Sequence, residues 1–327
     1  MLITQGFFIC PRVLRTLAYH NEEVKQVDII QAQDIFLINR RARNLSKSTI
    51  FWYKITTDKF ILHCEKNNKK NIEEIKSHNI EEFLISFKRE VCDRTLKDNF
   101  VALRTFFIFL FEEEYIQRNP MRNMRQPKVE QKVMRTFDKP EIEKMLKFFD
   151  RNDFLGLRNF LIMAMLFSTG MRKAELLGIK IQDVNITIDM IKVRGKGNKE
   201  RFVPISRTLR KILMQYTQER EEFLDDAYCE YLIVSRRKKQ LTNSGVTILF
   251  HNLKESLNMQ GERVSAHTWR HTFAKTFLLN GGDIFSLQKI LGHSDIAVTR
   301  RYIALNDKEV KLQHAKFNPL DNKEWMI

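Results

Sequence analysis

The chain has 327 residues, 43% of them hydrophobic, which is enough for two domains with cores of their own. Its formal net charge is +16, and both parts are basic: residues 1–127 carry 21 Lys/Arg against 16 Asp/Glu, and the remainder carries 35 against 24. This balance indicates a polyanionic partner that contacts both parts. No CxxC spacing joins the four cysteines, and the longest apolar run, residues 160–167, is too short to cross a bilayer. We therefore expect a cytoplasmic protein without disulfides, a cysteine zinc site or a membrane partner.

Residues 1–30 show no strong periodicity and are assigned no role. Apolar residues then recur at helical spacing in four segments, which begin near residues 34, 49, 80 and 97. We therefore expect a compact four-helix domain over residues 31–127. Four basic residues surround the end of its first helix and are the candidate contacts to a polyanion, namely Arg40, Arg41, Arg43 and Lys47.

A basic, proline-marked stretch, residues 128–136, is the predicted linker. Beyond it, Asp138 is a helix N-cap with Pro140 in the first turn, and residues 153–168 form an apolar helix that ends at Gly170. Alternation at residues 186–188, 190–193 and 201–205 predicts a small antiparallel sheet. Helical periodicity follows at 208–223, 244–259, 269–279 and 284–291. The predicted fold is therefore mainly α with a small antiparallel β-sheet, in a second domain over residues 137–305 that a tail, residues 306–327, follows.

One arginine, Arg172, stands just after the turn at Thr169–Gly170 and opens the next helix. The ordinary interpretation is a helix C-cap followed by a surface arginine. The functional interpretation is a guanidinium fork for two phosphate oxygens, with Glu175 one turn further on to hold it. The motif alone favours the ordinary interpretation.

A glycine-rich hairpin, residues 195–201, carries the sequence GKGNKER. Its lysines, Lys196 and Lys199, are ordinary solvated turn residues unless one of them reaches a leaving oxygen and protonates it. Spacing alone does not choose between the two. Lys199 and Arg201 are two further candidate contacts to a polyanion.

The stretch from His267 to Tyr302 concentrates polar chemistry in thirty-six residues. His267 and Arg270 lie near the start of a predicted helix, where an anion is favoured. His267 and His271 have an i, i+4 spacing that suits metals, but no carboxylate lies close in sequence, so we expect no metal, and a packed role for His271. His293 follows a Leu-Gly helix end. Taken singly, His293 would be an ordinary residue of a helix cap, and Tyr302 an ordinary core aromatic.

Together these motifs resemble the tyrosine site-specific recombinase family, which includes the phage integrases and Xer-type recombinases. The resemblance rests on their order: an arginine after Thr-Gly, a lysine in GKGNK, His-x-x-Arg, Leu-Gly-His, then a tyrosine nine residues later. It extends over roughly residues 31–327, including NLSKSTI at 44–50 and YIQRNP at 115–120. It implies a helical core-binding (SAM-like) domain and a catalytic domain that form a C-shaped clamp on DNA.

The resemblance also implies roles for single residues. Tyr302 would attack the scissile phosphate and form a 3′-phosphotyrosyl link, while Arg172 and Arg270 clamp the non-bridging oxygens. Lys196 would protonate the departing 5′ oxygen. His267 would assist proton transfer at the tyrosine, and His293 would donate a hydrogen bond to the phosphate. Glu175 and His271 would be supporting residues of the site. No cofactor is implied, because the covalent link conserves the energy of the phosphodiester.

The partners implied are double-stranded DNA with inverted-repeat sites in the nucleoid, a homo-tetramer on synapsed DNA, and an accessory DNA-bending or directionality factor. The tail at 306–327 would contact a neighbouring protomer. Integration or excision of a mobile element and resolution of DNA multimers both fit. Two alternatives are a non-catalytic DNA-binding protein on the same fold, and relaxation of DNA by a topoisomerase-like monomer.

Overall fold

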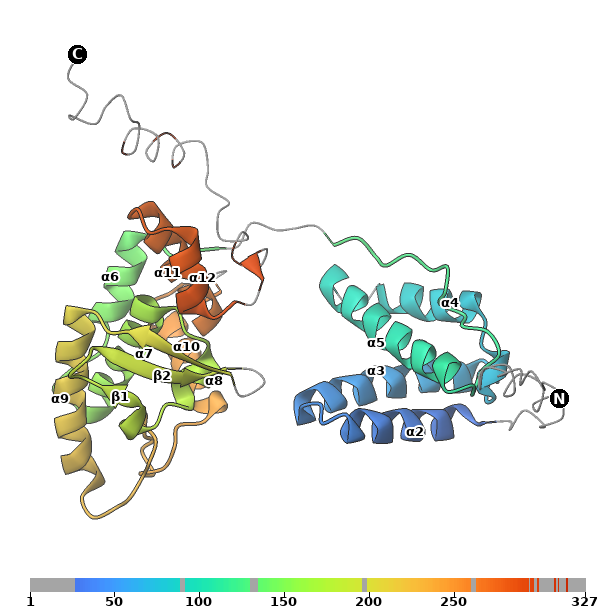
Figure 1. Ribbon diagram of the computed structural model, residues 1–327, viewed down its shortest axis with the longest axis horizontal. Helices are drawn as coiled ribbons and strands as arrows, with labels where there is room; N and C mark the ends of the chain where they lie inside the picture. Colours follow the sequence, from blue (N-terminus) through green and yellow to red (C-terminus); the bar gives the residue numbers. More distant parts are fainter. Residues whose placement is uncertain are drawn as a thin grey trace, which may run out of the picture. The chain divides into compact units, whose positions relative to one another are not determined.

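The computed structural model describes residues 27–88, 92–129, 135–195, 199–259 and 263–293, with residues 295, 296, 299, 309, 311 and 316. The chain divides between residues 131 and 132 into two compact units (Figure 1). Each unit has its own hydrophobic core. The expected fold class, mainly α with a small antiparallel sheet, is confirmed.

The first unit consists of α-helices around a phenylalanine-rich core. The helices are α2 (Ile29–Ala42), α3 (Lys47–Lys66), α4 (Ser77–Lys88) and α5 (Asp93–Glu112), with a 3-10 turn, η1, at Ile72–Glu74. Ser46 begins α3, because its side chain accepts the hydrogen bond of the Thr49 backbone N–H. Aromatic rings from α2, α3, α4 and α5 meet edge to face around Phe36 and Phe60. These contacts hold the helices together, and the exposed basic residues Arg41, Arg43 and Lys47 lie around the turn between α2 and α3.

The second unit places a three-stranded sheet against helices. The strands are β1 (Val184–Asn185), β2 (Met190–Arg194) and β3 (Glu200–Pro204), in the antiparallel order β1-β2-β3. The strand expected at 186–188 is wrong: those residues form a turn in which the Asn185 side chain accepts hydrogen bonds from the backbone N–H groups of Thr187 and Ile188. Ile191 faces Val203 and Val193 faces Arg201 across the β2–β3 ladder.

The helices of the second unit are α6 (Lys139–Lys147), α7 (Phe154–Thr169), α8 (Lys173–Leu177), α9 (Arg207–Leu224), α10 (Asn243–Ser256), α11 (Ala266–Leu279) and α12 (Ile284–Leu291), with a 3-10 turn, η2, at Ile181–Asp183. The apolar α7 packs against both α9 and α11, while α10 packs on α8 and α12 on β3. Trp269 of α11 is fully buried against Phe137 and Phe167. This packing sets α8, α11, α12 and the β2–β3 hairpin around one region (Figure 1).

Candidate active site

Arg172 is held from behind by a buried carboxylate. Gly170 ends α7 in the left-handed conformation (φ 61°), and Arg172 is the N-cap of α8. Glu175 accepts a 2.7 Å hydrogen bond from the Arg172 backbone N–H and a 2.8 Å hydrogen bond from its Nη1. The Glu175 side chain is 3% exposed and that of Arg172 is 45% exposed. The guanidinium is therefore oriented on one side and open to an anion on the other.

Arg270 is almost completely buried on the second turn of α11. Its Nη1 donates to the carbonyl of Gly170 at 2.7 Å, and its Nη2 donates to the carbonyl of Leu291 at 2.9 Å. A buried guanidinium needs such acceptors to offset its lost hydration. Arg270 therefore joins the end of α7, the start of α11 and the end of α12.

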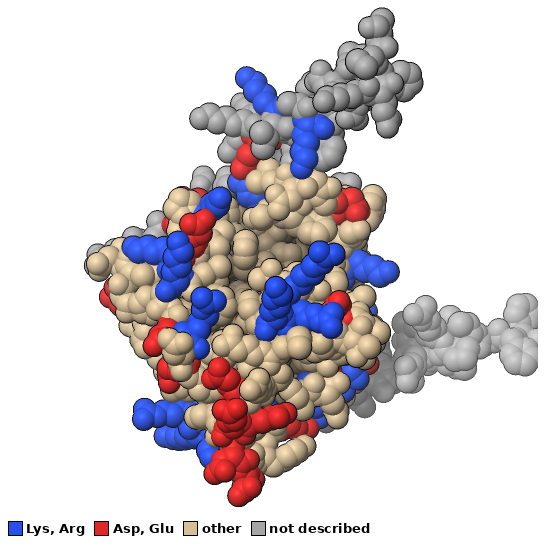
Figure 2. All heavy atoms as spheres, turned by 90° about the vertical axis from the view of Figure 1, so that its left-hand side faces the viewer, with Lys and Arg blue, Asp and Glu red and all other residues tan. Residues whose placement is uncertain are grey.

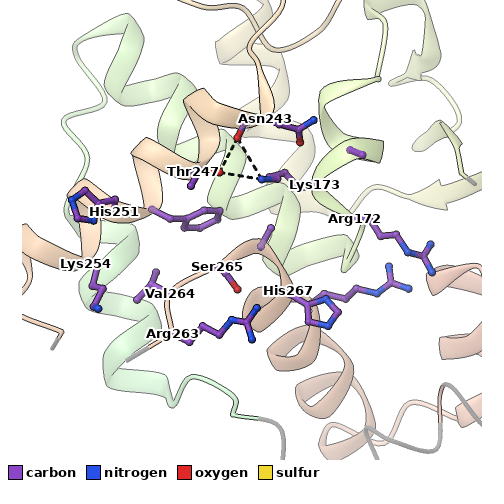
Figure 3. Close-up of a pocket in the computed structure, with 14 residues that line it drawn as sticks. Arg172, Lys173, Asn243, Thr247, His251, Lys254, Arg263, Val264, Ser265 and His267 are labelled. Atoms are coloured by element: carbon purple, nitrogen blue, oxygen red, sulfur yellow. Dashed lines mark hydrogen bonds between the residues drawn. The ribbon is translucent and has the colours of Figure 1, made fainter. Parts of the chain in front are cut away.

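Arg172, Arg270 and His267 line one pocket of about 690 Å³. Figure 3 shows the His267 ring between Arg263 and Arg172 in this view. Further cations continue the pocket towards α10, where Lys173 donates to the hydroxyl of Thr247 at 3.1 Å. Among the described residues that line the pocket, none is acidic; the basic ones are Arg172, Lys173, His251, Lys254, Arg263, His267 and Arg270. The arrangement suits an extended polyanion.

The charge on another face of the second unit is different. Figure 2 shows that face with acidic side chains gathered at its lower end and Lys and Arg scattered above and beside them. Five acidic residues lie in the last two turns of α9 and just after it, at Glu219, Glu221, Glu222, Asp225 and Asp226. The charged residues that line the pocket, by contrast, are all basic.

The two histidines of α11 are both neutral near pH 7. Desolvation, followed by the positive charges of Arg270, Arg263 and Arg172, lowers the pKa of His267. His271 is buried with its ring centroid 4.3 Å from that of His267, and burial lowers its pKa to about 4. The exposed His267 ring can therefore accept a proton, while His271 packs behind it.

His293 lies behind Arg270 rather than in the lining of the pocket. Its Nε2 is 2.6 Å from Nη2 of Arg270, and its Nδ1 is 2.8 Å from Oγ1 of Thr299. Arginine can only donate, so Nε2 accepts and Nδ1–H donates to the threonine hydroxyl. Burial and the neighbouring guanidinium groups lower the pKa of His293 to about 4, which agrees with a neutral ring.

Arg201 was expected to contact DNA, and the structure places it elsewhere. Its side chain is 14% exposed, and its two terminal nitrogens donate to the two carboxylate oxygens of Glu175 at 3.0 and 2.9 Å. Its Nε donates to the carbonyl of Ile290 at 2.8 Å. These three bonds tie the guanidinium of Arg201 to α8 and to the end of α12. The alternation of Arg201 and Val203 on the inner face of β3, continued by the buried Ile205 just after the strand, could have indicated this.

Arg40 is a second correction. It is 8% exposed, and its guanidinium lies over the rings of Phe36 and Phe109 at 4.9 and 5.4 Å. It therefore stabilises the first unit and does not face a ligand. Arg41, Arg43 and Lys47 are exposed around the α2–α3 turn, and Lys199 is exposed at the start of β3. These four stay candidates.

Two expected catalytic residues, Lys196 and Tyr302, lie outside the described residues. Gly195, just before Lys196, is described, and its backbone N–H donates to the carbonyl of Lys199. In the tail, Glu309 pairs with Lys275 of α11 at 2.7 Å. Contact of the tail with a neighbouring protomer stays a prediction.

Within the described ranges, no group of three His, Cys, Asp or Glu side chains could hold a metal ion. None of the helices that the structure describes is both long and apolar enough to cross a membrane.

The geometry and the motifs agree with the comparisons with known proteins. Residues 135–309 match the phage integrase family, and residues 36–114 match the N-terminal SAM-like domain of phage integrases. The chain belongs to the phage integrase family. It is 31% identical to the tyrosine recombinase XerD of Staphylococcus haemolyticus over 85% of this chain and 94% of that protein. It is 30% identical to the tyrosine recombinase XerC of Leptospira interrogans over 85% and 89%. The chain is therefore a tyrosine recombinase, an enzyme that acts on DNA.

Solved structures share the fold. The XerH recombinase bound to a palindromic difH substrate in a post-cleavage complex has a TM-score of 0.70 and 21% identity, over 87% of this chain and 84% of that one. A lambda integrase dimer bound to a COC′ core site has a TM-score of 0.69 and 18% identity, over 83% and 97%. At this identity the likeness supports the fold alone.

Proposed function

We propose that this recombinase cleaves and rejoins specific DNA sites through a 3′-phosphotyrosyl intermediate formed by Tyr302. The observation that carries the proposal is the convergence of Arg172, His267 and Arg270 on one basic pocket. These side chains come from two segments almost a hundred residues apart, which elements packed against α7 bring together. The family match also runs past Tyr302, to residue 309.

The two arginines would bind the non-bridging oxygens of the scissile phosphate. Charge accumulates on these oxygens as the fifth bond to phosphorus forms, and positioned donors then contribute most. Arg172 is oriented by Glu175, and Arg270 by the carbonyls of Gly170 and Leu291. Removing one such donor from a comparable site slows the reaction by about 100- to 1,000-fold.

Proton transfer would be divided between two groups. Tyrosine has a pKa of about 10, so its hydroxyl needs a base at neutral pH. His267 is neutral there and can take the proton as the Oη–P bond forms. Lys196 would then give a proton to the 5′ oxygen as the P–O5′ bond breaks. Rejoining reverses both transfers, so atoms and charge balance without a cofactor.

Strand exchange between two sites needs several protomers, and we propose a homo-tetramer on double-stranded DNA. The first unit would contribute Arg41, Arg43 and Lys47 to the phosphates, since these side chains are exposed together. The second unit would contribute the basic residues of the pocket to the contact with DNA. The family resemblance implies DNA sites with inverted repeats. Each of the two arms of one site would therefore bind one protomer.

A pool of synthetic duplexes, with random inverted-repeat arms around a central spacer, tests this proposal. The wild-type protein should become attached to a subset of duplexes in a form stable to SDS, and Tyr302→Phe should bind the same duplexes without attachment. The selected duplex, placed twice in a supercoiled plasmid, should recombine, while a plasmid without it should remain supercoiled. Attachment by Tyr302→Phe, or relaxation of the plasmid without sites, would contradict the proposal.

A further inference from the structure

Arg201 connects three elements that carry the proposed site. Its guanidinium makes a two-pronged ion pair with Glu175 of α8, and its Nε binds the carbonyl of Ile290 in the last turn of α12. Arg201 itself lies on β3, immediately after the hairpin that holds Lys196. No other described residue makes hydrogen bonds to both Glu175 and α12.

The Glu175 carboxylate is the shared centre of this network. Each of its oxygens accepts one bond from Arg172 and one from Arg201, four in all. A buried carboxylate bound by two guanidinium groups is fixed in orientation as well as in charge. Whatever moves Arg201 therefore moves the acceptor that orients Arg172.

The C-terminal end of α12 receives two guanidinium groups. Arg201 binds the carbonyl of Ile290, and Arg270 binds that of Leu291. These are among the last carbonyls of the helix, which have no partner within it, and its negative dipole end favours cations. His293 follows two residues later, so Arg201 also fixes the backbone that leads to it.

We propose that Arg201 is a positioning residue, which acts through Glu175 to hold Arg172 in the geometry that binds the scissile phosphate. The inference rests on the proposed function. It replaces the direct DNA contact that the charge of Arg201 alone would indicate. Lysine at this position would keep the positive charge. Its single ammonium group would make neither the two-pronged ion pair with Glu175 nor, in addition, the hydrogen bond to the carbonyl of Ile290.

The experiment compares Arg201→Lys with Arg194→Lys on the neighbouring strand. Arg194 pairs with Glu200 at the surface, 43% exposed, and makes no contact with Glu175, so it is the matched control. Single-turnover attachment to the selected duplex should slow by about 100-fold in Arg201→Lys, because displacement of a positioned group by about 1 Å costs that much. Arg194→Lys should stay within about twofold, and both variants should bind the duplex as the wild type does.

Two further arms separate positioning from other roles. A 5′-bridging phosphorothioate has a leaving group that needs no proton, so it should not restore Arg201→Lys if the defect lies at Arg172. Rescue by this substrate would assign the effect to the hairpin lysine and overturn the inference. Glu175→Gln, which keeps the shape and loses the charge, should reproduce the slow attachment. Normal rates in Arg201→Lys would also overturn it.

The outcomes also distinguish the inference from the proposed function. If the wild type forms no covalent adduct, or Tyr302→Phe still forms one, the proposed function fails. If both behave as expected and Arg201→Lys reacts as fast as Arg194→Lys, only the positioning role fails. Far-ultraviolet circular dichroism and thermal unfolding identify a variant that has lost its fold, and Glu175→Gln then carries the test.

Discussion

Nη2 of Arg270 lies 2.6 Å from Nε2 of His293, and this contact sets the tautomer of the imidazole. The ring proton resides on Nδ1, which faces the hydroxyl of Thr299. In this state His293 cannot donate from Nε2 to a phosphate. The role that the family resemblance gives to His293 therefore requires the Arg270 contact to change when DNA binds.

We predict that DNA binding moves the proton of His293 from Nδ1 to Nε2, because a phosphate oxygen would then compete for Arg270. Nitrogen NMR of the imidazole, on Tyr302→Phe with and without the selected duplex, measures the tautomer directly. His293→Gln provides the assignment of the signals. An Nδ1–H tautomer in both states would mean that His293 supports Arg270 and does not touch the phosphate.

Stability should fall as the pH is lowered from 6.5 to about 4. His271 and His293 are buried, and both have a pKa of about 4 in the folded chain against 6.5 for an ordinary histidine. The unfolded chain therefore binds protons in this range while the folded chain does not. Each of the two histidines therefore lowers the free energy of unfolding by about 1.4 kcal/mol for each pH unit in this range. Its stabilising contribution is fully present only above pH 6.5.

Urea unfolding at several pH values checks this expectation. In His271→Asn, the number of protons taken up on unfolding in this pH range should fall by about one. His78→Asn, at an exposed position of the first unit, is the control. An unchanged slope in His271→Asn would show that the ring is already charged in the folded protein.

Lys254 and Arg263, which line the pocket beyond Arg172, His267 and Arg270, should contribute affinity rather than rate. We expect Lys254→Ala with Arg263→Ala to weaken DNA binding and to reduce the slope of log K against log salt by about 0.9 for each lost phosphate contact. Fluorescence anisotropy on Tyr302→Phe measures both. The control pair, Lys139→Ala with Lys211→Ala, lies outside the pocket lining. Equal slopes in the two pairs would place the DNA elsewhere.

The general acid can be assigned between the two hairpin lysines. Lys196→Ala should attach slowly to an ordinary duplex and normally to a 5′-bridging phosphorothioate, because its leaving group needs no proton. A typical gain from positioned proton transfer is about 100- to 10,000-fold. Lys199→Ala is the control. Rescue of Lys199→Ala instead would transfer the role to that residue.

Local signals in the sequence are sufficient for many helix ends and for the arginine that follows α7. Asp138 and Pro140 begin α6 as expected, and Gly170 ends α7. Glu175 contacts Arg172 one turn on, as the spacing predicts. Such features depend on residues within a few positions of one another, so sequence patterns capture them.

Contacts between distant segments could not be predicted in the same way. Arg201 and Ile290 are 89 positions apart, and their hydrogen bond depends on how α12 packs against β3. Net charge suggested DNA contacts for Arg40 and Arg201, but both side chains are on buried faces of their elements. The helical spacing of Ile29, Phe36 and Arg40 on α2 could have excluded Arg40.

Gly292 ends α12 in the left-handed conformation (φ 66°), and a Cβ there would come within 2.8 Å of Cδ of Arg201. A random screen for recombination-deficient mutants should therefore recover substitutions of this glycine that leave the protein soluble and able to find its site. Such alleles would look like defects of a helix end. Their cause would be a displaced guanidinium on the facing strand, and compensating changes should be sought at position 201.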